Sequence, residues 1–323
     1  MTTTPKIGFL SHICTTGDPK RALDEAIRLC VAAEQLGYQS MWVAQHHFGA
    51  EDGVVPSPFV FLATLAAHTS RIRLGTAVVT LSLEDPIRAA EDAALVDLLS
   101  GNRLEVGLGT GAHQPTFDAM SREYHRRSAT TDINVGVLVS ALSGDPLPGG
   151  AVLVPRSETL TRRIWRATSS RKGATVAARL GHGLLLGRSA PLEAHPVGEV
   201  QRPIAEEYLA VSAAQGHVAR LAVTRTIVPT CEPSALANLA RHARRWGQED
   251  GLPVEFLRMS DAEVLDRHGI VTGDLHEIRA RLPEDRTACL ATDLIVQFQP
   301  GRLSLADSLT ALETLAHLRI RPA

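Results

Sequence analysis

The chain has 323 residues, 44% of them hydrophobic, and a formal net charge of −2 with histidine neutral. A sizeable core is therefore expected, and the scattered Lys and Arg give no electrostatic case for nucleic acid or an anionic membrane. No apolar run reaches the ~18 residues that a membrane-spanning helix needs, and the first residues lack the pattern of a signal peptide. The cysteines are far apart and form no C-x-x-C, so we expect reduced thiols in a cytoplasmic protein.

Strands and helices are expected to alternate along the first third of the chain. Apolar, β-rich runs predict strands at 6–10, 40–44, 71–81 and 103–109. Helical spacing of apolar residues predicts helices at 21–37, 57–70 and 85–101. Two of these helices open on a capping residue followed by proline, Ser57-Pro58 and Asp85-Pro86, because proline fits the first helical position.

The same alternation continues through the rest of the chain. Further strands are predicted at 162–170, 182–187, 220–228 and 293–298. Helices are predicted at about 119–142 and at 173–181, 202–216, 233–246, 274–282 and 304–318. The stretch 247–272 has no clear pattern. Ser304 with Asp307 three residues later resembles a capping box at the last helix.

Eight strands separated by helices predict a parallel sheet. Eight such units suit an α/β fold of the closed (β/α)8 TIM-barrel type, and we expect 1–323 to form a single domain of this kind. An open, doubly wound sheet is the alternative that the same pattern allows.

Two adjacent histidines, His46 and His47, follow Gln45 at the end of the second strand. Side chains alternate along a strand, so only one imidazole is expected to face the barrel mouth, where such barrels keep their chemistry. This argues against both histidines binding one ion, and the spacing to Glu51 matches no zinc motif, so no metal is expected. One histidine then handles a proton or hydrogen-bonds, or both pack structurally under the following loop.

Two glycine-containing turns follow later strands. The first, GLGTGA at 107–112, has the shape of a dinucleotide fingerprint but follows the fourth strand, so it indicates either a simple turn or close approach of a flat or phosphorylated ligand. The second carries Thr168, Ser169, Ser170 and Gly173 ahead of a helix. Its N–H groups suit a phosphate, whereas its hydroxyls also suit ordinary N-caps.

In combination, these segments resemble the bacterial luciferase-like flavin monooxygenase superfamily. The similarity is carried by "LGYQSMWVAQHHF", by the stretch from "PSPFVFLATLAAHTS" to "RLEVGLGTG", by the serine-glycine segment before "ATVAARLGHGLLL", and by "DLIVQF" with the last helix. The first two cover about 35–111 almost without a gap, and the match weakens over 112–160 and 229–272. "QHHF" with "GTG" most resembles a subgroup described as putative FMN-dependent luciferase-like monooxygenases.

The resemblance implies FMN lying across the mouth of a (β/α)8 barrel. It implies that His46 is the active-site histidine, which aids proton transfer, and that Ala77 and Val78 form a cis peptide under the flavin. It implies that Ser170 contacts the phosphate. The cofactor-binding set implied is Gln45, Ala77, Val78, Gly109, Thr110, Gly111, Ser169, Ser170 and Gly173.

Two positions depart from luciferase itself. Gln45 stands where luciferase has Glu, and Thr110 stands where it has an Arg that helps to hold the flavin phosphate. Loss of that Arg removes a charge-assisted contact. Arg171, Lys172 and Arg188 are the cations that could replace it.

The activity implied is a two-component monooxygenase, in which a separate reductase supplies reduced FMN and a flavin hydroperoxide formed with O2 oxidises a small organic substrate. One alternative is hydride transfer with the deazaflavin F420, as in some relatives. Another is a non-catalytic flavin-binding protein, because Thr110 weakens the phosphate site.

A homodimer is also expected. In the helix at 57–70 the apolar residues extend around more than one face: Phe59, Phe61, Leu62, Leu65 and Ala66. An apolar surface of this kind usually marks an interface, and relatives pair through this helix and the next. The other possibility is that 112–160 folds over the surface and covers it.

Overall fold

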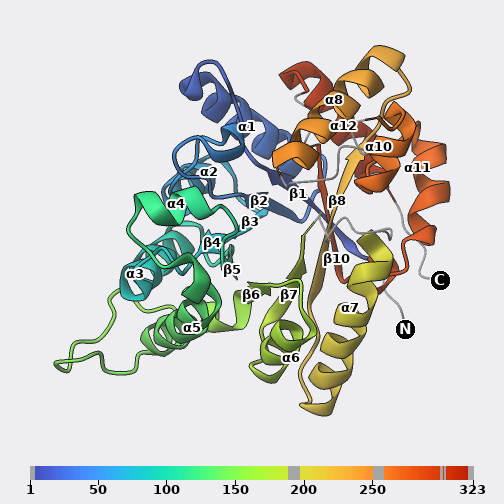
Figure 1. Cartoon of the computed structure of the whole chain (residues 1–323). Coiled ribbons are helices and arrows are strands. Elements are labelled where there is room, and N and C mark those ends of the chain that lie inside the picture. Colours follow the sequence, from blue (N-terminus) through green and yellow to red (C-terminus); the bar gives the residue numbers. More distant parts are fainter. Residues whose placement is uncertain (1–3, 188–196, 250–257, 299–300, 302, 319–323) are drawn as a thin grey trace.

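A closed, eight-stranded parallel barrel forms the centre of the protein (Figure 1). The computed structural model describes residues 4–187, 197–249, 258–298, 301 and 303–318. Each strand hydrogen-bonds to the next, and the last pairs with both the first and the seventh of the barrel, so the sheet closes. The barrel strands, in order, are β1 (Lys6–Ser11), β2 (Ser40–Val43), β3 (Arg73–Thr76), β5 (Leu104–Gly109), β6 (Ile164–Ala167), β7 (Gly183–Leu186), β8 (Leu221–Val228) and β10 (Asp293–Gln297).

The eight predicted strands and the barrel are thus confirmed, and the open doubly wound sheet is wrong. The predicted third strand at 71–81 is interrupted, however. It consists of β3 and the short β4 (Val79–Thr80), separated by a cis peptide between Ala77 and Val78, as the family resemblance implied. The second two-residue strand, β9 (Val271–Thr272), pairs in parallel with the end of β8 and lies within the stretch that sequence patterns left unassigned.

Helices surround the barrel on its outside (Figure 1). They are α1 (Pro19–Gln35), α2 (Pro58–His68), α3 (Pro86–Leu99), α4 (Gln114–Ala119), α5 (Arg127–Ser143), α6 (Arg171–Arg179), α7 (Val197–Ala214), α8 (Pro233–Glu249), α10 (Asp261–Arg267), α11 (Leu275–Arg281) and α12 (Leu305–Ala316). The prediction of a single helix at about 119–142 is wrong over its first residues. Ser121 adopts a left-handed φ of 54°, which ends α4, and a 3-10 turn at Tyr124–Arg126 precedes α5.

The barrel interior is filled by a layer of apolar side chains rather than left as a pore. This inner layer comprises Leu10, Trp42, Ala44, Trp165, Leu185, Ala222 and Ile295. Trp42 and Trp165 meet edge to face, with ring centroids 5.7 Å apart. Room for the two indoles comes from Gly75 and Gly183, since a Cβ at either position would overlap a Trp ring. The two tryptophans therefore fit inside the barrel because the residues beside their rings are glycines.

The apolar residues expected to form a dimer patch are buried within the single chain. Phe59, Phe61, Leu62, Leu65 and Ala66 all belong to the main core, so the reasoning from an exposed patch on α2 is wrong. They pack inward because α2 lies between the barrel and its neighbouring helices. The exposed large apolar side chains on α2 and α3 are instead Val60, Leu95, Leu98 and Leu99.

Across the part of the chain that is described, no helix combines the length and the apolar character needed to cross a membrane.

Replacing Gly75 by Ala tests the packing of the inner layer. The new Cβ would overlap the ring of Trp42, which is 1% exposed and cannot move away. We expect Gly75→Ala to lower the free energy of unfolding by ~1–3 kcal/mol, the usual effect of overpacking. Gly136→Ala is the matched control, because a Cβ there meets nothing within 4 Å in α5, and it should be neutral or stabilising. Urea denaturation of both variants measures the difference, and equal stabilities would contradict this account.

Candidate active site

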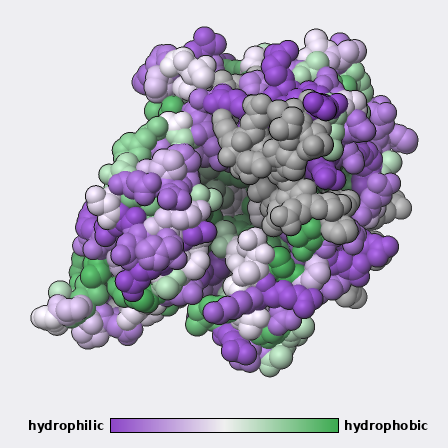
Figure 2. Space-filling view, in the orientation of Figure 1, coloured by the Kyte–Doolittle hydropathy of each residue, from purple (hydrophilic) through white to green (hydrophobic). Residues whose placement is uncertain are grey.

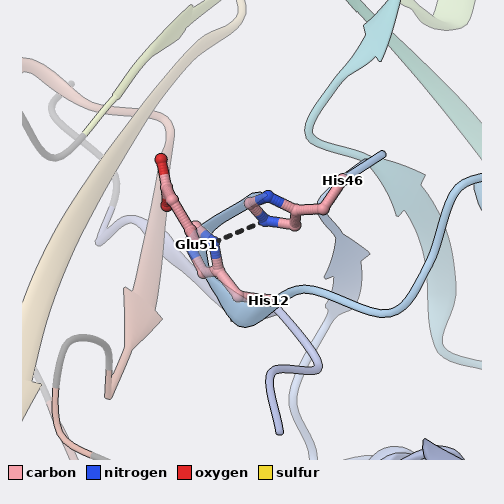
Figure 3. A group of neighbouring side chains, drawn as sticks. All are labelled: His12, His46 and Glu51. Atoms are coloured by element: carbon pink, nitrogen blue, oxygen red, sulfur yellow. Dashed lines mark hydrogen bonds between the residues drawn. The ribbon is translucent and has the colours of Figure 1, made fainter. Parts of the chain in front are cut away.

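Four polar side chains form a continuous hydrogen-bonded belt at the mouth of the barrel, the end at which the strands finish. Gln297 at the end of β10 donates from Nε2 to Thr226 Oγ1 of β8 over 2.9 Å. The Gln297 Oε1 atom lies 2.9 Å from His12 Nε2, just beyond β1. His12 Nδ1 lies 3.2 Å from His46 Nε2, just beyond β2 (Figure 3). This polar belt of Thr226, Gln297, His12 and His46 crosses four neighbouring strands.

The position of His46 follows from strand alternation and from the loop after β2. Trp42 and Ala44 face the inner layer, so His46 continues the inward-facing series. Its backbone N–H donates to the carbonyl of Val55 over 2.9 Å. Gly53 lies against its ring, where any Cβ would overlap the imidazole. The loop therefore holds His46 from two sides.

The adjacent His47 does not belong to the polar belt. Its Nε2 atom is buried and has no hydrogen-bond partner among the described residues. Burial lowers the pKa of His47 below the ordinary histidine value, and the Glu84 carboxylate opposes that effect. Burial therefore disfavours the charged form of His47, and the ring lies outside the belt. The geometry thus separates the two histidines as alternation predicted, while the role assigned to His46 stays a prediction.

A third group joins the two imidazoles of the belt. The ligand atoms of His12, His46 and Glu51 all lie within 4.8 Å of one another (Figure 3). Spacing along one segment did not reveal this group, because His12 arrives from another strand, and the expectation of no metal stays a prediction. Two imidazoles and a carboxylate are chemically able to hold a metal ion. The same groups equally suit proton handling, with the carboxylate favouring a positive charge on either ring.

Gln45 has a different environment from the one implied by the resemblance. Its Oε1 accepts from the backbone N–H of Thr80 over 2.6 Å, immediately after the cis peptide. Its Nε2 donates to the carbonyl of Pro56 over 3.0 Å and to Glu84 Oε1 over 2.8 Å. Gln45 thus joins β2, β4 and two loops. Its amide is engaged within the chain, so its placement in the cofactor-binding set stays a prediction.

Among the described residues, the opposite half of the mouth carries short side chains. Its residues are Ala77, Val78, Gly109, Ala167 and Gly187, which we call the small-residue half. Figure 2 shows a hollow at the centre of the viewed face, with apolar residues inside it. Short side chains leave room above the inner layer for a flat ligand.

The glycines of the GTG turn are needed by the chain itself. A Cβ at Gly109 would lie 2.5 Å from Val78, and one at Gly111 would lie 2.6 Å from Thr80. Gly111 also has a left-handed φ of 72°. The carbonyl of Thr110 between them accepts from Ser82 Oγ over 2.9 Å. These contacts hold the turn against the cis peptide segment, so close internal packing accounts for both glycines.

The N-terminus of α6 borders the same region. Ser170 caps the helix by accepting from the backbone N–H of Gly173 over 3.1 Å, and its Oγ lies 3.2 Å from Thr168 Oγ1. Gly173 must be glycine because a Cβ would overlap Thr168. Among the described residues, nothing accepts from the backbone N–H groups of Arg171 and Lys172, and Ser169 and both cations are exposed. Arg188, the third candidate cation, lies outside the described residues.

The sequence profile described as luciferase-like monooxygenase matches residues 6–288 of the chain. Among curated relatives, the chain is 41% identical over 138 residues to the 4-hydroxyprotoasukamycin monooxygenase of Streptomyces nodosus subsp. asukaensis, covering 42% of this chain and 37% of that protein. It is 36% identical over 101 residues to the oxygenase component of the flavin-dependent trigonelline monooxygenase of Acinetobacter baylyi, covering 31% of this chain and 28% of that one. The chain therefore spans well under half the length of these two relatives.

Solved structures share the fold along nearly the whole chain. The oxygenating constituent of 3,6-diketocamphane monooxygenase from Pseudomonas putida, in complex with FMN, superposes with a TM-score of 0.78 at 14% identity, covering 98% and 100% of the two chains. The coenzyme F420 dependent tetrahydromethanopterin reductase from Methanopyrus kandleri superposes with a TM-score of 0.71 at 16% identity, covering 98% of each chain. At such identities the likeness concerns the fold alone.

Substituting Gln45 tests whether its amide is a structural link. Gln45→Ala leaves the buried N–H of Thr80 without an acceptor, which should lower the free energy of unfolding by ~1–3 kcal/mol in the protein without any cofactor. Gln114→Ala, at the exposed start of α4, is the control and should change stability little. Denaturation without flavin measures both. An unchanged stability of Gln45→Ala would refute the structural role.

Proposed function

The chain belongs to the luciferase-like monooxygenase family, and we propose that it is a flavin-dependent monooxygenase that uses reduced FMN and O2 to oxidise a small organic substrate. The single observation that carries this proposal is the two-sided mouth of the barrel. An imidazole held in a polar belt, His46, faces a half lined with small residues that leave space for a flat ring. This combination places an imidazole that could transfer a proton beside an apolar surface that could hold a flat ring.

The residues fit FMN in two places. The isoalloxazine ring would lie over Ala77 and Val78, beside Gly109, where side chains are short. The phosphate would lie at the N-terminus of α6, near Ser169, Ser170 and the backbone N–H groups that have no acceptor within the described chain. Arg171 and Lys172 are the described cations that would replace the missing Arg at position 110. Bound reduced FMN supplies the electrons and the centre at which O2 reacts.

In this proposal the protein orients the flavin and the substrate, excludes water and supplies a proton-transferring group. The inner layer below the mouth is built of apolar side chains, which favour exclusion of water from a bound ring. His46, the belt residue that follows Trp42 and Ala44 of that layer, is the group proposed to accept or donate the proton. A separate reductase is proposed as the source of reduced FMN, supported by the relative that is itself named as an oxygenase component.

A cofactor titration tests this proposal directly. Because an F420-dependent reductase has the same fold, the protein should be titrated with reduced FMN and with reduced F420, followed by O2 consumption. Tight binding of reduced FMN with O2 uptake on adding a substrate is the expected result. Binding of F420 with hydride transfer and no O2 uptake would identify the alternative chemistry.

A homodimer is proposed on a corrected surface. Leu95, Leu98 and Leu99 of α3 are 47%, 63% and 61% exposed and share one helix face, since they are three and four residues apart. Figure 2 shows apolar residues along the left edge of the molecule, over α3 and α5. Two-fold pairing would bury this face against its own copy.

The first functional prediction concerns the two neighbouring histidines. His46→Ala should lower turnover by ~10²–10⁴-fold, the usual contribution of a proton-transferring group, while the melting temperature stays close to wild type. His47→Ala should mainly change stability, since its half-buried ring lies outside the belt. Steady-state O2 uptake and thermal melts of both variants provide the test. Equal, large losses of turnover with normal melting would disprove the assignment.

The second prediction concerns the phosphate. Ser170→Ala should weaken reduced FMN binding by ~1.5–3 kcal/mol, the range for a hydrogen bond to a charged group, and should leave riboflavin binding unchanged. Because the substitution also removes the α6 cap, Ser304→Ala is the control, since Ser304 caps α12 in the same way. Anaerobic fluorescence titration measures both ligands. Unchanged FMN affinity would rule out this phosphate site.

The third prediction concerns assembly. Light scattering at micromolar concentration should give twice the 34.7 kDa chain mass, and Leu98→Glu should shift the mass towards the monomer by placing a charge in the interface. Val218→Glu, at a residue 88% exposed outside α3, should leave the mass unchanged. A wild-type mass of one chain at all concentrations would exclude the dimer.

A further inference from the structure

The polar belt contains a second imidazole that nothing in the family resemblance singled out. His12 lies one residue beyond β1, and Leu10 two positions earlier belongs to the inner layer, so His12 faces the same mouth as His46. It contacts a belt residue on each side, Gln297 through Nε2 and His46 through Nδ1. Both of its nitrogens are therefore hydrogen-bonded within the belt.

With the Gln297 amide oriented as in this structure, these contacts set the donor and acceptor roles of the two imidazoles towards each other. The Gln297 amide donates from Nε2 to Thr226, so its Oε1 acceptor faces His12. A carbonyl oxygen only accepts, so His12 must carry its proton on Nε2. The Nδ1 atom of neutral His12 is then an acceptor, and the 3.2 Å contact requires His46 to donate from Nε2.

We propose that His12 is the positioning residue of this site: oriented by Gln297, it fixes neutral His46 as the Nε2–H tautomer and so places the basic lone pair of His46 on Nδ1. Gln297 suits this task because its side chain is fully buried and bonded at both ends of the amide.

The arrangement also spreads the charge that proton uptake creates. When a proton binds at Nδ1 of His46, the proton on Nε2 can pass to Nδ1 of His12. One ring is then imidazolium and the other neutral throughout, and the pair gains one proton in total. His12 therefore acts through His46 and has no contact with the reacting atoms in this scheme.

Two substitutions of His12 separate its two contacts. In His12→Asn the side-chain oxygen takes the place of Nδ1, so an acceptor for His46 is retained and the contact with Gln297 is lost. In His12→Gln the longer amide takes the place of Nε2, so the contact with Gln297 is retained and the acceptor for His46 is lost. Both replacements are polar and similar in size to histidine.

The readout is the tautomer of His46 in the protein without flavin, measured by long-range proton–nitrogen NMR on histidine-labelled protein. Wild type and His12→Asn should show the Nε2–H form, and His12→Gln should show a mixture of both tautomers. His47→Gln is the control and should leave the His46 signals unchanged, because His47 lies outside the belt. A His46 signal that is identical in all four proteins would overturn the proposal, as would the Nδ1–H form in wild type.

Turnover supplies a second readout that rests on the proposed function. His12→Gln should lower kcat at least tenfold with little change in KM, and His12→Asn should recover most of the loss. If the NMR result holds and reduced FMN does not bind, the proposed function fails while the role of His12 stands. Elemental analysis of the purified protein provides a last measurement. One equivalent of a transition metal that is lost in His12→Gln would mean that an ion, and not a proton, lies between the two rings, and it would refute the proposal.

Discussion

The closed register of the parallel barrel is the constraint on which the rest of this structure depends. Once Trp42 and Ile295 point inward, every second residue along those strands must do so as well, because the pleat alternates strictly. His46 and Gln297 then follow at the mouth, in the same series as the inner layer. A shift of one residue in any strand would turn its mouth residue towards the helices. The hydrogen bonds between adjacent strands therefore determine which polar groups meet.

This register gives the mouth two chemically different halves. The strands β8, β10, β1 and β2 end in side chains that bond to one another, and buried polar groups of this kind are stable only when each has a partner. On the other side, β5 and β6 end in Gly109 and Ala167, and β3 and β7 are followed by Ala77 and Gly187. A polar ligand bound across the mouth would therefore meet hydrogen-bonding groups on one side and bare surface on the other. The apolar inner layer beneath both halves keeps water from below.

Several residues chosen from the family resemblance serve the chain itself in this structure. Gln45 bonds to the backbone after the cis peptide, Gly109 makes room for Val78, and Ser170 caps α6. These contacts place the cis segment and the α6 N-terminus accurately relative to the mouth. These residues could contact a cofactor while keeping their contacts within the chain, because a ligand would meet their main-chain groups and short side chains.

The sequence alone determined the number of barrel strands, the helix starts at Pro58 and Pro86, and the opposite directions of His46 and His47, because each follows from local patterns among neighbouring residues. Only the tertiary structure decided the partners of His46. His12 and Gln297 are 285 residues apart, and no periodicity links them, so they meet only because β1 and β10 close the barrel. The same holds for α2: its pattern of apolar residues on several faces looked like an exposed patch, yet packing between the barrel and neighbouring helices buries it. Local pattern fixes which way a side chain turns, whereas closure of the sheet fixes what it touches.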